Sequence, residues 1–339
     1  MEYRRLGNSG CLVSSCALGT MTFGAEADEA ESRRILDTFV DWGGTLVDVA
    51  DVYVGGVSEQ IVGRWWKALD ASRRDSVVLA TKGRFPLGVE PRDAGLSRRH
   101  LRRALEGSLT RMGVDHVDLY QMHSWDPLTP IEETVAFLAD AVSSGKVGYV
   151  GVSNFTGWQI AAFAATAHGR VPFVSVQPQY SLLVRQTEWE IVPAAEHAGV
   201  GLLPWSPLGG GWLTGKYRRD VRPDGPTRLG EQPDRGSEAY DRRSGHQRTW
   251  TVLDAVAHIA DARGVTMAQV AVAWLLARPG VTSVILGARG ASQLADNLGA
   301  TNLSLDPGEM AQLDAASDPE PADYPYGGPG IEQRSRPTT

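Results

Sequence analysis

The stretch VGYVGVS, residues 147–153, lies between two helical patterns, Pro130 to Ser144 and Thr156 to His168. It is apolar along most of its length and lacks the regular polar alternation of a half-exposed strand. This pattern is typical of a strand that is buried on both faces of a parallel sheet. The flanking patterns carry apolar residues at three- and four-residue spacing, as a helix packed on a sheet does. The segment therefore predicts a strand with a helix on either side.

The same unit recurs along the chain. Short apolar runs begin near Cys16, Thr45, Ser76, His116, Val147, Phe173, Val200 and Val281, with helical patterns between them. Eight strands that alternate with helices predict a single α/β fold, the (β/α)8 or TIM barrel. Before the first strand, Tyr3 to Val13 predicts a β-hairpin that turns at Asn8-Ser9-Gly10 and plugs the bottom of the barrel.

Two segments fall outside this repeat. Residues 218–247 contain four apolar residues among many Arg, Asp, Gly and Pro, which predicts a long loop after strand seven. We expect this loop to be mobile without a ligand and to become partly ordered when one binds. Residues 318–339 are rich in Pro and Gly and predict an extended tail, so the barrel domain is expected to span residues 1–317.

Composition narrows the class of protein. The 339 residues carry 33 Lys and Arg against 40 Asp and Glu, a net charge of −7 that argues against nucleic acid or an anionic membrane as the main partner. The cluster of Arg residues at 98–103 is expected to be a solvated helix face. We expect no membrane span, no signal peptide at Met1 to Gly7, and no metal site at Cys11 and Cys16. A reduced, cytoplasmic protein is the expectation.

Four polar residues fall at or just beyond three consecutive strand ends, where barrels of this kind place their chemistry. They are Asp48, Tyr53, Lys82 and His123. A buried Lys ammonium lowers the pKa of a neighbouring phenol, and Asp48 would keep that ammonium charged. With His123 orienting a substrate carbonyl or sharing the proton, the set suits protonation of the alkoxide that forms when a hydride adds to a carbonyl.

A dinucleotide could be held by the later strands, since no G-x-G-x-x-G follows an early strand. Ser153, Asn154 and Gln177 could grip a carboxamide, and Trp205 offers a flat face for a ring. The glycine-rich run at 206–211 suits contact with a pyrophosphate. Glycines and a helix start at 287–297 predict an anion site.

These motifs resemble those of the aldo-keto reductases, and the resemblance covers Tyr3 to Ala315. It rests on residues 47–53 (VDVADVY), 81–82 (TK), 121–123 (QMH), 145–155 (GKVGYVGVSNF), 205–208 (WSPL), 213–217 (LTGKY), 285–289 (ILGAR) and on Asn297. Val49 departs from the usual Thr, and Val54 stands where Gly commonly follows the Tyr. The resemblance implies that Tyr53 is the general acid, that Lys82 and Asp48 tune it, and that His123 orients the carbonyl.

The resemblance also implies a nicotinamide cofactor, and Arg289 favours NADPH over NADH because it can pair with a 2′-phosphate. The predicted cofactor site comprises Gly19, Thr20, Met21, Asp48, Ser153, Asn154, Gln177, Trp205, Ser206, Pro207, Leu208, Gly210, Lys216, Gly287, Arg289, Gln293 and Asn297. The predicted walls of the substrate pocket are Phe23, Phe85, Trp125 and Trp212. An apolar or aromatic carbonyl compound is the expected substrate.

The predicted function is therefore the reversible NADPH-dependent reduction of an aldehyde or ketone to an alcohol. Two alternatives stay open at this point. One is a nicotinamide-binding regulatory subunit with little turnover, since the family contains channel-associated members. The other is a lyase that forms a Schiff base on Lys82. The sequence does not choose between an aldehyde, a cyclic ketone and a keto sugar, and it leaves the oligomeric state open.

Overall fold

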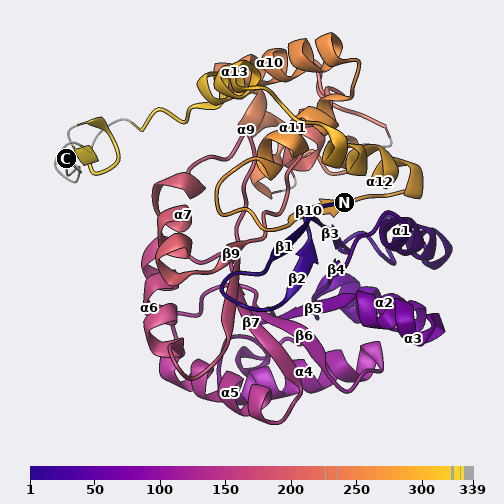
Figure 1. Cartoon of the computed structure of the whole chain (residues 1–339), viewed down its shortest axis with the longest axis vertical. Coiled ribbons are helices and arrows are strands. Elements are labelled where there is room, and N and C mark those ends of the chain that lie inside the picture. Colours follow the sequence, from indigo (N-terminus) through magenta and orange to yellow (C-terminus); the bar gives the residue numbers. More distant parts are fainter. Residues whose placement is uncertain (226, 235, 322–323, 329, 332–339) are drawn as a thin grey trace.

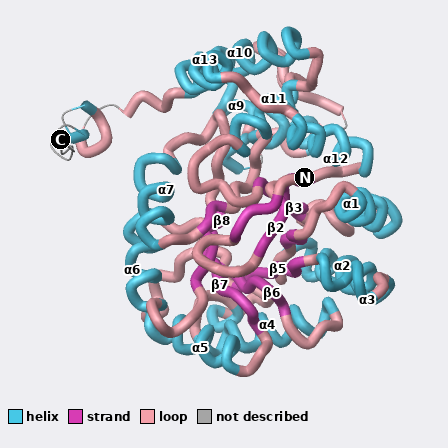
Figure 2. The backbone as a smooth tube through the Cα atoms, in the orientation of Figure 1, coloured by secondary structure: helices cyan, strands magenta, loops and turns pink. Residues whose placement is uncertain are grey.

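In the computed structural model, eight parallel strands form a barrel enclosed by helices (Figures 1 and 2). The structure describes residues 1–225, 227–234, 236–321, 324–328 and 330–331. The barrel strands are β3 (Cys16–Gly19), β4 (Leu46–Asp48), β5 (Val78–Gly83), β6 (Val117–Met122), β7 (Val147–Ser153), β8 (Phe173–Gln177), β9 (Gly201–Leu202) and β10 (Val284–Gly287). Neighbours in the chain are neighbours in the sheet, and β10 pairs with β3. A parallel bridge between Leu202 and Val281 joins the two remaining edges. The predicted TIM barrel is confirmed.

Helices occupy the outside of the barrel in Figure 2. They are α1 (Glu29–Asp41), α2 (Val57–Ala68), α3 (Ala71–Ser76), α4 (Arg98–Met112), α5 (Ile131–Ser143), α6 (Gly157–Ala167), α7 (Thr187–Ala198), α10 (Gln247–Arg263), α11 (Met267–Leu276), α12 (Ala291–Leu298) and α13 (Pro307–Ser317), with 3-10 turns η1 (Tyr53–Gly56), η2 (Pro91–Asp93) and η5 (Gly299–Asn302). Two helices, α2 and α3, lie between the second and third barrel strands, because the Asp70 side chain accepts the Arg73 N–H at 2.9 Å and starts α3 after α2 has ended. Because α3 extends to Ser76, the strand that is predicted to begin near Ser76 begins at Val78.

The N-terminal hairpin closes the end of the barrel at which the strands begin. Its strands β1 (Tyr3–Arg5) and β2 (Leu12–Ser14) pair antiparallel, and Figure 1 shows them across the middle of the barrel. The Ser14 N–H donates to Thr45 Oγ1 at 2.8 Å, immediately before β4. Leu6 and Val13 are fully buried and pack against the inward residues of the barrel strands. The predicted plug is confirmed.

The predicted insertion between β9 and α10 is present, and it contains short helices that the sequence pattern does not predict. It contains η3 (Gly209–Thr214), α8 (Arg228–Glu231), η4 (Gly236–Glu238) and α9 (Tyr240–Ser244), while residues 226 and 235 lie outside the described part. Leu229 and Tyr240 are buried, and the Tyr240 ring stacks on Trp212 with centroids 5.5 Å apart. The few apolar residues of this segment thus suffice to anchor its second half.

The division into a barrel domain and a tail stays a prediction. Of the predicted tail, residues 322–323, 329 and 332–339 lie outside the described residues. Within the described part, the Tyr326 ring stacks on Trp189 of α7 at 5.4 Å. Among the helices that the structure describes, none alone has the length and apolar character needed to span a membrane. Helices α10 and α11 reach that length and apolar character only when they are taken together, and they are bent by 102° relative to each other.

Candidate active site

A cavity of about 800 Å³ opens at the end of the barrel where the strands finish. Every barrel strand contributes to its wall, through a residue at its last position or just beyond it. These residues are Gly19, Asp48, Phe85, His123, Ser153, Gln177, Trp205 and Gly287. Because parallel strands deliver their carboxyl ends to one side, side chains from distant parts of the sequence share one space.

Lys82 joins the predicted catalytic residues in a buried hydrogen-bond network. Its ammonium donates to Asp48 Oδ2 at 2.6 Å, to Val49 O at 2.9 Å and to Tyr53 Oη at 3.0 Å. The side chain of Lys82 is fully buried, whereas Tyr53 also lines the cavity. All three donors of the ammonium are therefore used, and the phenol lies between the ammonium and the open space.

The electrostatics of this network differ from the expectation for Tyr53. Burial raises the pKa of Tyr53 above its ordinary value, and the Lys82 ammonium offsets only part of that rise. The predicted net lowering of the Tyr53 pKa is therefore not found, since desolvation penalises the phenolate more than the ammonium stabilises it. Burial opposes the charge of Lys82 as well, but Asp48 and Tyr53 outweigh it and raise its pKa. Lys82 is thus an ammonium throughout the neutral range.

His123 faces the same space as an uncharged ring. Its ring centroid lies 5.8 Å from that of Tyr53 and 4.6 Å from that of Phe85, both in edge-on geometry. Burial lowers the pKa of His123 well below its ordinary value, and the positive charges of Lys82 and Arg84 lower it further. A neutral imidazole can donate one hydrogen bond to a carbonyl oxygen without protonating it.

Two glutamines hold Asp48 from the other side. The amide nitrogens of Gln121 and Gln177 each donate to Asp48 Oδ1 at 3.0 Å. Gln177 is predicted to grip a carboxamide, and it still lines the cavity, but in this state its amide supports the counter-ion of Lys82. Gln121 has no predicted role. The sequence signal that could have indicated a role for Gln121 is its position two residues before His123, because residues two apart in a strand lie on the same face.

The far half of the cavity is rich in charge. The guanidinium of Arg289 donates from Nε to Glu26 Oε2 at 2.5 Å and from Nη2 to Glu231 Oε2 at 3.1 Å. Lys216 also lines this half; burial and the neighbouring charges of Arg289 and Arg228 lower its pKa. Cations thus gather at this end, and acidic side chains currently pair with Arg289.

Comparison with known proteins agrees with this arrangement. The sequence pattern of the Aldo/keto reductase family matches residues 16–318. The chain belongs to this family. It is 39% identical to an uncharacterized oxidoreductase, YrpG, of Bacillus subtilis, over 90% of this chain and 93% of that protein. It is 37% identical to a probable voltage-gated potassium channel subunit beta of Arabidopsis thaliana (89% and 92%) and 34% identical to an L-glyceraldehyde 3-phosphate reductase of Escherichia coli O157:H7 (93% and 92%).

As an aldo/keto reductase, the chain is an oxidoreductase that acts on carbonyl groups. Most of its predicted cofactor residues line the cavity: Gly19, Met21, Asp48, Ser153, Asn154, Gln177, Trp205, Ser206, Pro207, Leu208, Gly210, Lys216, Gly287, Arg289 and Gln293. Thr20 and Asn297 are buried and do not reach its surface. Arg228, Gln232 and Glu238 line the cavity without having been predicted. They lie in the insertion after β9, whose path the sequence pattern does not indicate.

The predicted substrate walls of this aldo/keto reductase need correction. Phe85 lines the cavity, but Phe23 and Trp212 are fully buried in the hydrophobic core and do not. Trp125 packs edge-on against Phe155 and Trp158, with centroids 5.3 and 5.2 Å away, and also lies off the cavity wall. A position just past a strand end does not tell whether an aromatic side chain points inward or under the loop.

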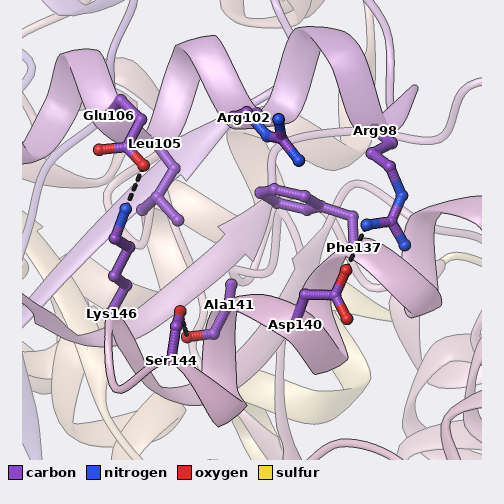
Figure 3. Close-up of a pocket in the computed structure, with 9 residues that line it drawn as sticks. All are labelled: Arg98, Arg102, Leu105, Glu106, Phe137, Asp140, Ala141, Ser144 and Lys146. Carbon is purple, nitrogen blue, oxygen red and sulfur yellow. Dashed lines mark hydrogen bonds and ion pairs between the residues drawn. The ribbon is translucent and has the colours of Figure 1, made fainter.

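A second hollow of about 360 Å³ lies outside the barrel, between α4 and α5. Figure 3 shows an ion pair at each side of it, Lys146 with Glu106 and Arg98 with Asp140, and apolar side chains between them. None of the predicted catalytic or cofactor residues lines it. Four of its five charged side chains form these two ion pairs, and it lies far from the strand ends, so the cavity at the strand ends is the candidate active site.

Proposed function

We propose that this aldo/keto reductase uses NADPH to reduce an aldehyde or ketone to the alcohol, reversibly, with Tyr53 as the proton donor. The observation that carries the proposal is the position of the Tyr53 hydroxyl. The hydroxyl is 3.0 Å from the Lys82 ammonium, and the Tyr53 side chain lines the cavity next to the His123 ring. A hydroxyl so placed can donate a proton to the cavity and leave its negative charge next to a cation.

The chain's own groups divide the work as follows. His123, neutral through burial, orients the carbonyl oxygen by a hydrogen bond. As negative charge develops on that oxygen, Tyr53 transfers its hydroxyl proton to it. The phenolate that remains is stabilised by the Lys82 ammonium, which Asp48 holds at 2.6 Å. The reverse reaction uses the phenolate as the base that removes the proton from an alcohol.

The lining of the cavity supports nicotinamide adenine dinucleotide phosphate as the proposed cofactor. Near the catalytic residues, the Trp205 ring and the amide groups of Asn154 and Gln177 offer stacking and hydrogen bonds to a nicotinamide carboxamide. At the far end, Lys216 and Arg289 offer positive charge to a 2′-phosphate, which supports NADPH over NADH. When bound, the cofactor supplies the hydride that adds to the carbonyl carbon.

The first test removes only the proton donor. Loss of reduced-nicotinamide absorbance is measured with a panel of aldehydes, cyclic ketones and keto sugars, using NADPH and NADH in parallel. Tyr53→Phe should lower kcat by at least about 100-fold, a typical contribution of a positioned acid, while NADPH still binds. Tyr3→Phe is the matched control, because the Tyr3 hydroxyl donates to Gly43 O at the opposite end of the barrel.

Near wild-type turnover by Tyr53→Phe would exclude Tyr53 as the acid. If the wild-type chain binds NADPH but turns over none of the carbonyl compounds, the regulatory-subunit alternative is favoured, as the name of the Arabidopsis relative suggests for that protein. The complete set of catalytic residues argues against that outcome. The lyase alternative is disfavoured because Lys82 spends all three donors on acceptors within the fold. A cytoplasmic location remains a prediction.

A further inference from the structure

A second aspartate lies on the segment that connects Asp48 to Tyr53, and the proposed mechanism does not use it. Asp51 is 1% exposed, and its backbone N–H donates to Lys82 O at 3.2 Å. It is therefore fixed to the strand that carries the catalytic lysine and stands two residues before the proposed acid. Asp48, not Asp51, pairs with the Lys82 ammonium.

The carboxyl of Asp51 lacks the partners that a buried carboxylate needs. Among the described residues, no side chain or backbone group reaches either of its oxygens with ordinary hydrogen-bond geometry. The backbone N–H of Val52 comes close enough to lower the pKa of Asp51 a little, but it does not cancel the rise that burial causes. A buried, unpaired carboxylate is costly, so a carboxyl in this position favours its neutral form.

Charged and titratable groups face Asp51 from each element packed around it. From α2 comes Glu59, whose carboxylate is bound by Thr81 Oγ1 at 2.7 Å and by Arg111 Nε of α4 at 2.5 Å. From β5 comes Lys82, and from β6 comes Tyr120, a fully buried phenol whose hydroxyl also lacks a partner within the described part of the chain.

Burial and the Glu59 carboxylate raise the pKa of Asp51 to about 7, against the weaker opposing effects of Arg111 and Lys82. Asp51 thus changes charge in the neutral range, whereas Lys82 does not. In its ionised form, Asp51 raises the pKa of Tyr53 further. A phenol with a higher pKa is a weaker proton donor to an alkoxide.

We propose that Asp51 is a positioning residue of this active site: its buried carboxyl acts through the segment that carries Tyr53, and its charge modulates how readily Tyr53 releases a proton. The inference rests on the proposed role of Tyr53 as the acid. Carbonyl reduction is then fastest when Asp51 is neutral, and it slows when Asp51 ionises. Over this pH range Tyr53 stays protonated and Lys82 stays an ammonium, so neither of them causes the change in rate. Asp51 is buried and does not line the cavity, so its carboxyl acts on the reaction only through its neighbours.

The test compares the wild-type chain with Asp51→Asn, which preserves the shape of the neutral carboxyl and cannot ionise. The rate of the first turnover is measured by loss of reduced-nicotinamide absorbance from about pH 6 to about pH 8, which spans the expected transition. The wild-type rate should fall about three- to tenfold with a midpoint near 7, and the Asp51→Asn rate should stay at the low-pH level. A purely structural role would change the rate without removing the transition.

Asp118→Asn is the matched control. Burial also raises the pKa of Asp118, but this residue is near the start of β6, at the opposite end of the barrel, where it accepts the Leu79 N–H at 2.8 Å. The control should keep the wild-type transition. A transition near 7 that persists in Asp51→Asn overturns the inference while leaving the proposed function intact.

A second measurement does not depend on turnover or on the stability of the variant. In the wild-type chain carrying isotope-labelled aspartate, the infrared C=O stretch of a protonated carboxyl should disappear with a midpoint near 7, and it should do so in Asp118→Asn as well. Absence of that band at about pH 6 overturns the inference. If the band titrates but the chain reduces no carbonyl compound, the proposed function fails instead.

Discussion

Lys82 fixes the geometry of the candidate active site through a single side chain. Its three donors bind Asp48, Val49 O and Tyr53, so the acid, its counter-ion and the backbone of the tyrosine segment share one anchor. Val54, directly after the acid, has φ 50 and ψ 41, a left-handed conformation that is strained for a β-branched side chain. This is the position at which the family commonly has Gly. The anchored network thus holds the segment in a conformation that its own sequence disfavours.

Arg289 is the residue on which cofactor preference should depend. Arg289→Ala removes a charged contact worth about 1.5–3 kcal/mol to a phosphate, so the KM for NADPH should rise about 10- to 100-fold and the KM for NADH much less. Steady-state measurements with both cofactors check this. Arg263→Ala is the control, because Arg263 pairs with Glu309 of α13, away from the cavity. Equal effects on the two cofactors would show that Arg289 does not distinguish them.

The structure adds a second expectation for Arg289. Glu26 and Glu231 each accept a hydrogen bond from its guanidinium, so their negative charges compete with a 2′-phosphate for this cation. Glu231→Gln weakens that competition and should lower the KM for NADPH while leaving the KM for NADH nearly unchanged. An increase in the KM for NADPH would indicate that the pair helps to shape the site instead of competing with the phosphate.

Residues at strand ends were predictable for a physical reason. A parallel barrel brings the ends of its strands together, so Asp48, Tyr53, Lys82 and His123 could be placed at one site without coordinates. The pKa direction of Tyr53 was not predictable, since it depends on how completely burial excludes water from the phenol. The positions of Phe23 and Trp212 were not predictable either, because a loop aromatic serves a pocket and a core equally well.

At the scale of elements, the hydrophobic pattern identified all the barrel strands and most of the helices between them, but not α13, which follows the last strand. The insertion after β9 escaped it. Its helices α8, η4 and α9 are each five residues or shorter, too short to show a repeat and too short to be stable alone. They hold their shape through tertiary contacts, above all the stack of Tyr240 on Trp212 and the burial of Leu229.

Limited digestion with trypsin tests how this insertion behaves. Cleavage should concentrate at the exposed Arg218 and Arg219, and it should be slow at Arg243, whose Nε donates to the buried Glu238 at 3.0 Å. NADPH should slow cleavage at the first two sites, because the cavity-lining residues that follow them become fixed. Tyr240→Ala removes the stack on Trp212 and should speed cleavage at Arg243. Identical rates at every site with and without NADPH would exclude a role for the insertion in holding the cofactor.

For the whole molecule, two buried active-site groups make stability depend on pH in opposite directions. The pKa of His123 is lowered in the folded chain, so the folded state binds fewer protons than the unfolded state and loses stability as the pH falls below about 6.5. The pKa of Asp51 is raised from 3.8 to about 7, so the folded state holds an extra proton between these values and loses stability as the pH rises through that range. The site therefore limits stability on both sides of neutrality.

Asp51→Asn should remove the second of these limits. Three pKa units at about 1.4 kcal/mol each set an upper bound of about 4 kcal/mol, a large share of the 5–15 kcal/mol that typically holds a fold together. The free energy of unfolding, measured in urea at about pH 5 and about pH 8, should therefore favour the variant over the wild-type chain more at the higher pH. Asp254→Asn, at an exposed position on α10, is the control and should show no such dependence. A difference between variant and wild type that is the same at both pH values would mean that Asp51 ionises in the folded chain as it does in the unfolded one, and the carboxyl would then have no charge change near neutrality to transmit to Tyr53.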